Sequence, residues 1–252
     1  MLENQLPNRR IEISVTSDCK IGPAKIGELQ YVSKTNSLGL VFSQWPHGVG
    51  ELPLQAAYSA LHDYLKTLQG QEQYCAYLEQ KLSFLCKSLG ISGGYSLSQE
   101  ARDAVSQRLG KIKFIREPSA KEIASSGQSN WTEGRFSNGY EVYSKFPMAL
   151  EHEIGHAASD MTYLAQPFEQ NQRASNFEEA FNSLVEGRDA FGNFSYEQFS
   201  DHLFRSLSLL ASEQRKQVLD NCVGVWLNLP SAYVLQDDVY AFFAKALVAH
   251  GK

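Results

Sequence analysis

The sequence is short of positive charge, and this shortage argues against two kinds of partner. It contains 23 Lys and Arg against 28 Asp and Glu, which gives a formal net charge of −5 at pH 7. Proteins that bind nucleic acids present a basic face to the phosphates, and segments that bind anionic membranes carry clusters of Lys and Arg. We therefore expect neither nucleic acid nor an anionic membrane surface as a partner.

Paired cysteines and long apolar segments are lacking as well. Cys19, Cys75, Cys86 and Cys222 are scattered without a C-x-x-C pair, which is typical of reduced thiols in a reducing compartment. No run of 18 apolar residues exists, so we expect no transmembrane helix. The first ten residues lack the apolar core of a secretory signal peptide. We expect either a cytoplasmic protein or one exported without a cleavable signal, including delivery into a host cell.

The most informative segment is His152-Glu153-Ile154-Gly155-His156, which has the pattern H-E-x-x-H. Histidines four residues apart lie on one face of a helix, about one turn apart. Two neutral imidazoles so placed can bind one Zn²⁺ at about 2.0–2.1 Å. Glu153 is turned by about 100° around the helix, where it can reach a water on that metal without being a ligand. The motif predicts one zinc per chain, held by His152 and His156, with Glu153 as the catalytic base.

The residues around the motif favour a helix that packs against the protein. Pro147 suits a first helical turn. An apolar stripe runs along one flank, formed by Ala149, Leu150, Ile154, Ala157 and Ala158. Gly155 costs a helix about 1 kcal/mol relative to Ala, which predicts that another element approaches closely there. The alternative is a surface helix whose two histidines are solvated.

A catalytic zinc usually takes three protein ligands, and two adjacent acids are the candidates for the third. Glu178 and Glu179 lie in a helix that we expect over residues 176–186. Ser175 with Glu178 fits a capping box, which would occupy Glu178 at the helix start. Asn182 and Ser183, about one turn after Glu179, are small enough to let two helices approach. We favour Glu179, keep Glu178 as the alternative ligand, and also keep the alternative that both are solvated acids at a helix start.

This arrangement resembles the gluzincin group of the zincin superfamily, in which a glutamate on a later helix completes the H-E-x-x-H site. Phe177-Glu178-Glu179 also resembles a stretch of clostridial neurotoxin light chains whose second glutamate binds zinc, and lethal-factor-like toxins have a comparable acidic helix. The metzincin extension is absent, because Ser159 and Thr162 stand where its Gly and His would be. The resemblance covers little more than residues 140–190. It implies a zincin-like fold and a peptidase similar in size to compact bacterial effectors and toxins.

The remaining pattern predicts an α+β fold. Strands are expected at residues 11–15, 25–32, 38–42, 111–116 and 140–143, with a polar Gly- and Ser-rich loop over 124–139. Helices are expected at residues 52–68, 71–89, 96–109 and 235–250, with others beginning at Ser195 and Ser212. The β-rich segment 1–45 is accessory or part of the same domain. Residues 46–252 would form a zincin-like domain: a small mixed sheet, the metal helix and a helical C-terminal half, with a cleft between 111–160 and 175–252.

Together these features predict a zinc-dependent endopeptidase that binds a protein or peptide substrate in extended form. Several side chains are eligible to stabilise the oxyanion, and the sequence does not choose among Tyr163, Tyr196, His202, Tyr233 and Tyr240. One alternative is a catalytically inactive zincin-fold protein used for binding or regulation. The other is a helical interaction domain in which the motif is accidental.

Overall fold

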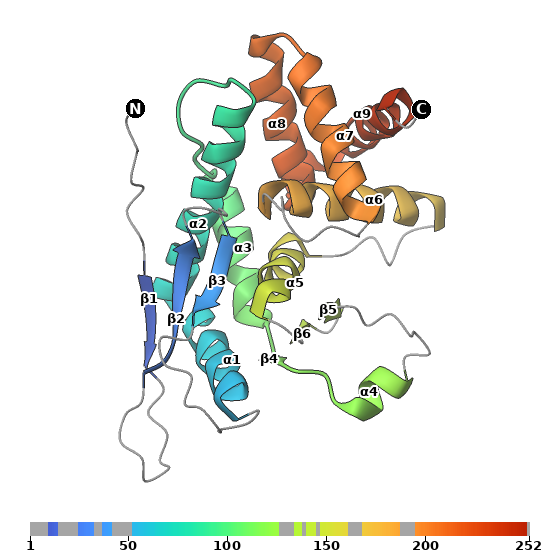
Figure 1. The fold of residues 1–252 in the computed structure, drawn as a ribbon. Coiled ribbons are helices and arrows are strands. Elements are labelled where there is room, and N and C mark those ends of the chain that lie inside the picture. The colour runs from blue at the N-terminus through green and yellow to red at the C-terminus, as the bar shows by residue number, and fades with distance from the viewer. Residues whose placement is uncertain are drawn as a thin grey trace. The chain divides into compact units, whose positions relative to one another are not determined.

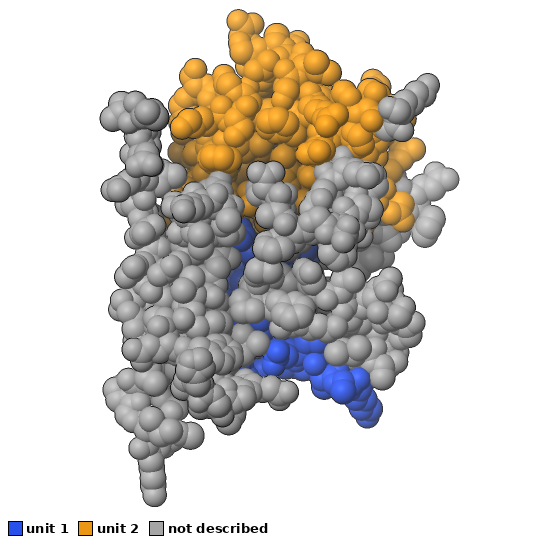
Figure 2. All heavy atoms as spheres, in the orientation of Figure 1, with its two compact units in different colours: residues 1–70, 109–157 blue, residues 71–108, 158–252 orange. Residues whose placement is uncertain are grey.

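The computed structural model of the chain describes residues 10–14, 25–32, 37–41, 52–125, 134–137, 140–144, 147–160, 168–186 and 195–250. The chain forms two compact units: residues 1–70 with 109–157, and residues 71–108 with 158–252 (Figure 2). All three boundaries fall inside helices, so α2, α3 and α5 each contribute residues to both units. This division differs from the one at residue 45, which stays a prediction.

The first unit contains a three-stranded antiparallel sheet close to the N-terminus. Its strands β1 (Arg10–Ser14), β2 (Lys25–Val32) and β3 (Ser37–Val41) follow one another in the order β1-β2-β3 (Figure 1). The expectation of a β-rich first 45 residues is confirmed at these strands. Helix α1 (Leu52–Leu65) contacts β1 and β2, and its buried side chains Tyr58 and Leu61 form part of the core of this unit.

A second, mixed sheet in the same unit leads into the motif helix. Strands β4 (Phe114–Arg116) and β6 (Glu141–Ser144) pair in parallel, and β5 (Gly134–Ser137) pairs antiparallel with β6. Ile115 and Val142 lie opposite each other in the register and are both buried. The expected loop over 124–139 is therefore wrong at β5, because pairing with β6 gives this polar segment an extended conformation that its own pattern does not signal.

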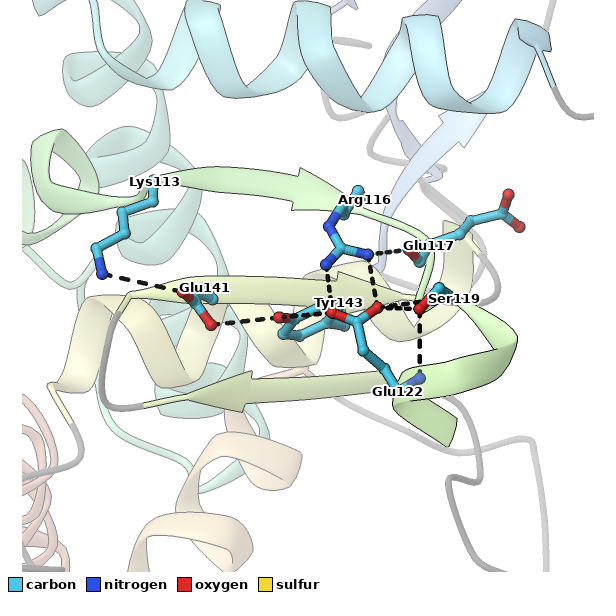
Figure 3. A network of polar contacts seen from close by, with 7 residues as sticks. All are labelled: Lys113, Arg116, Glu117, Ser119, Glu122, Glu141 and Tyr143. Carbon is cyan, nitrogen blue, oxygen red and sulfur yellow. Dashed lines mark hydrogen bonds and ion pairs between the residues drawn. The ribbon is translucent and has the colours of Figure 1, made fainter. Parts of the chain in front are cut away.

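The other face of this sheet carries a network of charged side chains (Figure 3). The Arg116 guanidinium donates to both carboxylate oxygens of Glu122, at 2.9 and 2.5 Å, and its carbon lies 4.8 Å from the centroid of the Tyr143 ring. The Tyr143 hydroxyl donates to Glu141 Oε2 at 3.2 Å, and Glu141 lies 3.9 Å from Lys113 Nζ. The carboxylates of Glu122 and Glu141 thus each have a cation beside them, Arg116 and Lys113 respectively.

Glu122 also closes the start of the short helix α4 (Ala120–Ser125). The Ser119 backbone N–H donates to Glu122 Oε2 at 2.9 Å, and the Glu122 N–H donates to Ser119 Oγ at 3.3 Å. This reciprocal pair is a capping box. Hydrogen bonds from Arg116 and Ser119 hold the pKa of the Glu122 carboxyl well below its usual range. The network thus ties α4 to strand β4.

The second unit is helical. It contains α2 (Leu68–Ser88), most of α3 (Gln99–Lys111), α6 (Phe168–Glu186), α7 (Ser195–Leu209), α8 (Ser212–Trp226), the 3₁₀ helix η2 (Pro230–Leu235) and α9 (Gln236–His250). Helix α6 lies across α7 and α8 and also contacts α9 (Figure 1). The rings of Phe177 and Phe181 on α6 pack against Phe243 and Trp226 at centroid distances of 5.9 and 5.4 Å. Burial of these aromatic rings is the main favourable term for this packing.

The helix starts were predicted with mixed success. Helix α8 begins at Ser212 as expected, and Ser98 caps α3, because the Ala101 N–H donates to Ser98 Oγ at 3.2 Å. Gly70 falls between the expected helices 52–68 and 71–89, but it lies in the first turn of α2, where Thr67 Oγ1 accepts its N–H at 3.0 Å. A Cβ at Gly70 would lie 2.0 Å from the Tyr64 carbonyl oxygen, so close backbone approach explains this glycine.

The molecule is a mostly helical α+β protein, which confirms the predicted fold class at that level. Cys75, Cys86 and Cys222 are free and buried, and Cys19 lies outside the described residues. None of the described helices is both long enough and apolar enough to span a membrane.

Candidate metal centre

The motif forms a helix, as the sequence predicts. Helix α5 (Pro147–Ser159) follows β6 directly and carries all five motif residues. The predicted apolar stripe is confirmed at Leu150, Ile154, Ala157 and Ala158, which are all buried. Gly155 is buried as well, as expected for a residue approached by another part of the protein. The helix ends at Ser159, and the next residue, Asp160, has a φ of 59°, the left-handed conformation that often stops a helix.

The two histidines converge on one point. Their Nε2 atoms lie 2.9 Å apart, and their rings meet edge to face at a centroid distance of 4.4 Å. His156 is 4% exposed, whereas His152 is partly open to solvent. The alternative of two solvated histidines on a surface helix is therefore wrong for His156. Two buried or half-buried imidazoles that direct the same nitrogen to one point are suited to sharing a cation.

Glu179 on α6 completes a set of three donors. One ligand atom from each of His152, His156 and Glu179 lies within 4.8 Å of the other two. A tetrahedral zinc with bonds of about 2.0–2.1 Å spaces its ligands roughly 3.3 Å apart. The observed spread exceeds that spacing by at most about 1.5 Å. Two imidazoles and a carboxylate are also the donor types that zinc prefers, so these residues fit a zinc ion.

The Glu178 side chain makes a contact outside the metal cluster. It is 6% exposed, and its Oε1 accepts a hydrogen bond from the Ser159 hydroxyl. The capping box that we expected from Ser175 to Glu178 is wrong, because α6 begins at Phe168, seven residues before Ser175. The alternative that both acids are solvated at a helix start is wrong for the same reason. Glu179, the acid favoured from the sequence, is the one in the cluster, whereas the capping argument about Glu178 is replaced by the contact of Glu178 with Ser159.

Glu153 is buried and lies one residue after His152, so it points away from the line of the two histidines by about 100°. Its role as a base and the three ligand roles stay predictions. The cleft expected between residues 111–160 and 175–252 also stays a prediction.

The structure brings a further residue to the end of α5 that the sequence did not indicate. The Arg108 guanidinium donates to the carbonyl oxygens of Ala158 at 2.9 Å and Ser159 at 3.3 Å. The same guanidinium donates to the carbonyl oxygens of Leu227 and Asn228 after α8. Its Nε lies 3.7 Å from Asp160 Oδ2, and Asp160 is not part of the metal cluster. Only the fold joins these segments, so no local pattern could have found Arg108.

The candidates for oxyanion stabilisation are spread over the helical unit. Tyr163 lies outside the described residues, as does the side chain of Tyr196. His202 stacks on His250, and Tyr233 is exposed on η2. Tyr240 packs on Phe177 at 5.8 Å, and burial together with the charge of Glu178 raises its pKa to about 12. A high pKa keeps the Tyr240 hydroxyl protonated, which is the state that donates hydrogen bonds.

Comparisons of the chain with protein-family models, with curated proteins and with solved structures found no match.

Proposed function

We propose that the protein is a zinc-dependent endopeptidase that hydrolyses peptide bonds of a protein substrate. The observation that carries the proposal is the convergence of His152, His156 and Glu179 from two helices, with the buried Glu153 beside them. The three residues are separated in sequence but offer the donor set of a catalytic zinc site. When bound, zinc supplies Lewis acidity, which activates a water and polarises the scissile carbonyl.

Each residue of the proposed site has a separate role. His152 and His156 bind through Nε2, which requires both imidazoles to be neutral. Glu179 adds one negative charge to the ligand set. Glu153 accepts the proton of the attacking water and then returns it to the leaving amine, so the carboxylate is regenerated after each turnover. A hydroxyl such as that of Tyr240 is available as a donor, and its contact with substrate is part of the proposal.

The sheet next to the motif helix supports binding of an extended peptide. Among the described strands, β5 pairs only with β6 and lies at the edge of the order β4-β6-β5. An edge strand offers unpaired N–H and C=O groups to a further strand. Strand β6 leads into α5 after two residues, so this sheet and the metal ligands are connected by a short segment. This arrangement is compatible with the zincin-like fold that the motif resembles.

An inactive zincin-fold protein that uses its metal for binding or regulation is the second candidate. It is favoured by the burial of Glu153, because a general base must reach water. The two candidates share the metal and differ in turnover, so one substitution separates them.

The test combines metal analysis with the substitution Glu153→Gln. Purified wild type should contain about one zinc per chain, and Glu153→Gln should keep it while losing at least about 10²-fold in turnover. A proteome-wide search for new peptide termini measures turnover even when the substrate is unidentified. The matched control is Glu213→Gln, which neutralises an exposed acid on α8. Full activity of Glu153→Gln would contradict the assigned base, and zinc without any new termini would favour the binding protein.

A further inference from the structure

Ser159 and Glu178 form a buried contact between the end of α5 and α6. Ser159 is the last residue of α5 and lies three residues after His156. Its hydroxyl donates to Glu178 Oε1, and both side chains are almost fully buried. A hydroxyl–carboxylate hydrogen bond is charge-assisted, and such bonds are roughly twice as strong as neutral ones. The contact therefore fixes one point of α6 relative to the helix that carries the histidines.

The consequence for the metal ligands follows from helix geometry. Glu178 and Glu179 are consecutive on α6, so their side chains leave the helix about 100° apart. When Glu178 is bound to Ser159, this rotation directs Glu179 away from Ser159, and the structure places its carboxylate within 4.8 Å of the histidine nitrogens. The acid that does not join the cluster thus contributes to fixing the orientation of α6 about its own axis.

Arg108 fixes the other partner of the contact. Its side chain is 8% exposed and donates to the carbonyl oxygens of Ala158 and Ser159, the last two residues of α5. These carbonyls belong to the last turn, which has no further turn of helix to bond to. The positive charge beside them also suits the negative end of the helix dipole. Arg108 therefore holds the backbone of Ser159 while the hydroxyl of Ser159 holds Glu178.

We propose that Ser159, Glu178 and Arg108 position the zinc ligands, so that Glu179 already lies beside His152 and His156 in the metal-free protein. The inference rests on the proposed metal site and deepens it. The three residues do not ligate the ion; they act through Glu179 and α5. Partners behind metal ligands typically change metal affinity by 10–100-fold when they are removed, and that is the expected effect here.

The test measures the zinc dissociation constant of the full chain by competition with a chromophoric chelator. Ser159→Ala should weaken zinc binding by about 10–100-fold, whereas Ser159→Thr, which keeps the hydroxyl, should bind as wild type does. Glu178→Gln retains an oxygen that accepts the hydrogen bond from Ser159, so its zinc affinity should fall only slightly. Glu178→Asp withdraws the carboxylate by one methylene and should weaken zinc binding as Ser159→Ala does. The matched control is Ser208→Ala, which removes a hydroxyl bonded only within α7 to the Phe204 carbonyl.

The outcomes separate this inference from the proposed function. Zinc affinity within threefold of wild type in both Ser159→Ala and Glu178→Asp would overturn the positioning role. Loss of zinc in Glu178→Gln as complete as in His156→Ala would also overturn it, because Glu178 would then be the ligand. If wild type itself bound no zinc, the proposed function would fail. Thermal unfolding of the metal-free variants identifies any that do not fold, and Glu178→Asp then decides in place of Ser159→Ala.

Discussion

Two arginines at the centre of polar networks differ in where they lie and in what they bind. The Arg116 side chain is 30% exposed and pairs with a carboxylate, Glu122, six residues away on α4 (Figure 3). The buried Arg108 binds backbone carbonyls that lie 50 to 120 residues away in the sequence. In the first network a partly exposed arginine pairs with an acid nearby in the chain, and in the second a buried arginine joins distant segments.

The comparison indicates how energy and function are distributed in this molecule. A surface ion pair contributes little to the free energy of unfolding, because water already solvates both charges and salt screens them. A buried guanidinium is different, because its removal leaves several carbonyl groups without a donor in a region that water does not reach. The buried network includes the end of the helix that carries the metal ligands. We therefore expect the two networks to respond differently to the same change.

The largest expected effect is that of Arg108→Met. It removes the donors for the carbonyls of Ala158, Ser159 and Leu227, and the free energy of unfolding should fall by about 3 kcal/mol or more. Arg116→Met is the matched change at the surface and should have a much smaller effect. Urea unfolding followed by circular dichroism measures both. Equal losses in the two variants would contradict the distinction between the networks.

A third basic residue, Lys81, extends the comparison to the dependence of stability on pH. Lys81 on α2 is 1% exposed, donates to the Glu186 carbonyl at 2.7 Å, and burial lowers its pKa to about 7. Between pH 7 and about 10, Lys81 is neutral in the folded chain and protonated in the unfolded chain, so unfolding takes up a proton. Stability should therefore rise with pH in this window, by at most about 1.4 kcal/mol per pH unit, and the slope should vanish below pH 7.

Lys81→Met isolates this contribution, because all other titrating groups are common to both proteins. The difference in unfolding free energy between wild type and variant should change with pH between 7.5 and 9. A difference that is independent of pH over this range would show that Lys81 keeps its charge in the interior.

The smallest effect is expected at the surface network. Ser119→Ala removes the hydroxyl that accepts the Glu122 N–H at the start of α4, and loss of such a cap costs about 1 kcal/mol. Ser119→Asp keeps a capping oxygen but places a second negative charge beside Glu122. Chemical denaturation of the two variants and wild type gives the comparison. A loss at Ser119 as large as that at Arg108 would mean that exposure does not separate the two networks.

The same contrast explains what the sequence could predict. The spacing of His152 and His156 is a local property of one helix. The alternation of apolar and polar residues in β1 and the start of α8 at Ser212 are likewise local features of the sequence. Strand β5 was missed because its partner, not its composition, makes it extended. Arg108 was missed because its partners lie in two distant segments, residues 158–160 and 227–228, that only the fold brings together.

The choice between Glu178 and Glu179 shows most clearly what the sequence alone could not predict. The spacing of small residues after Glu179 indicated the acid that joins the cluster, but the capping argument used for Glu178 failed because α6 begins earlier. The contact that occupies Glu178 comes from Ser159, nineteen residues before it. No periodicity connects these two positions, so tertiary structure was required.

The most direct test of the metal centre is X-ray absorption at the zinc edge on the purified full chain loaded with zinc. We predict about one zinc per chain, with two imidazole nitrogens at about 2.0–2.1 Å and at least one oxygen in the first coordination shell. His156→Ala should remove the imidazole signal together with most of the metal. A shell containing sulfur at about 2.3 Å, or wild type that retains no zinc, would contradict the account.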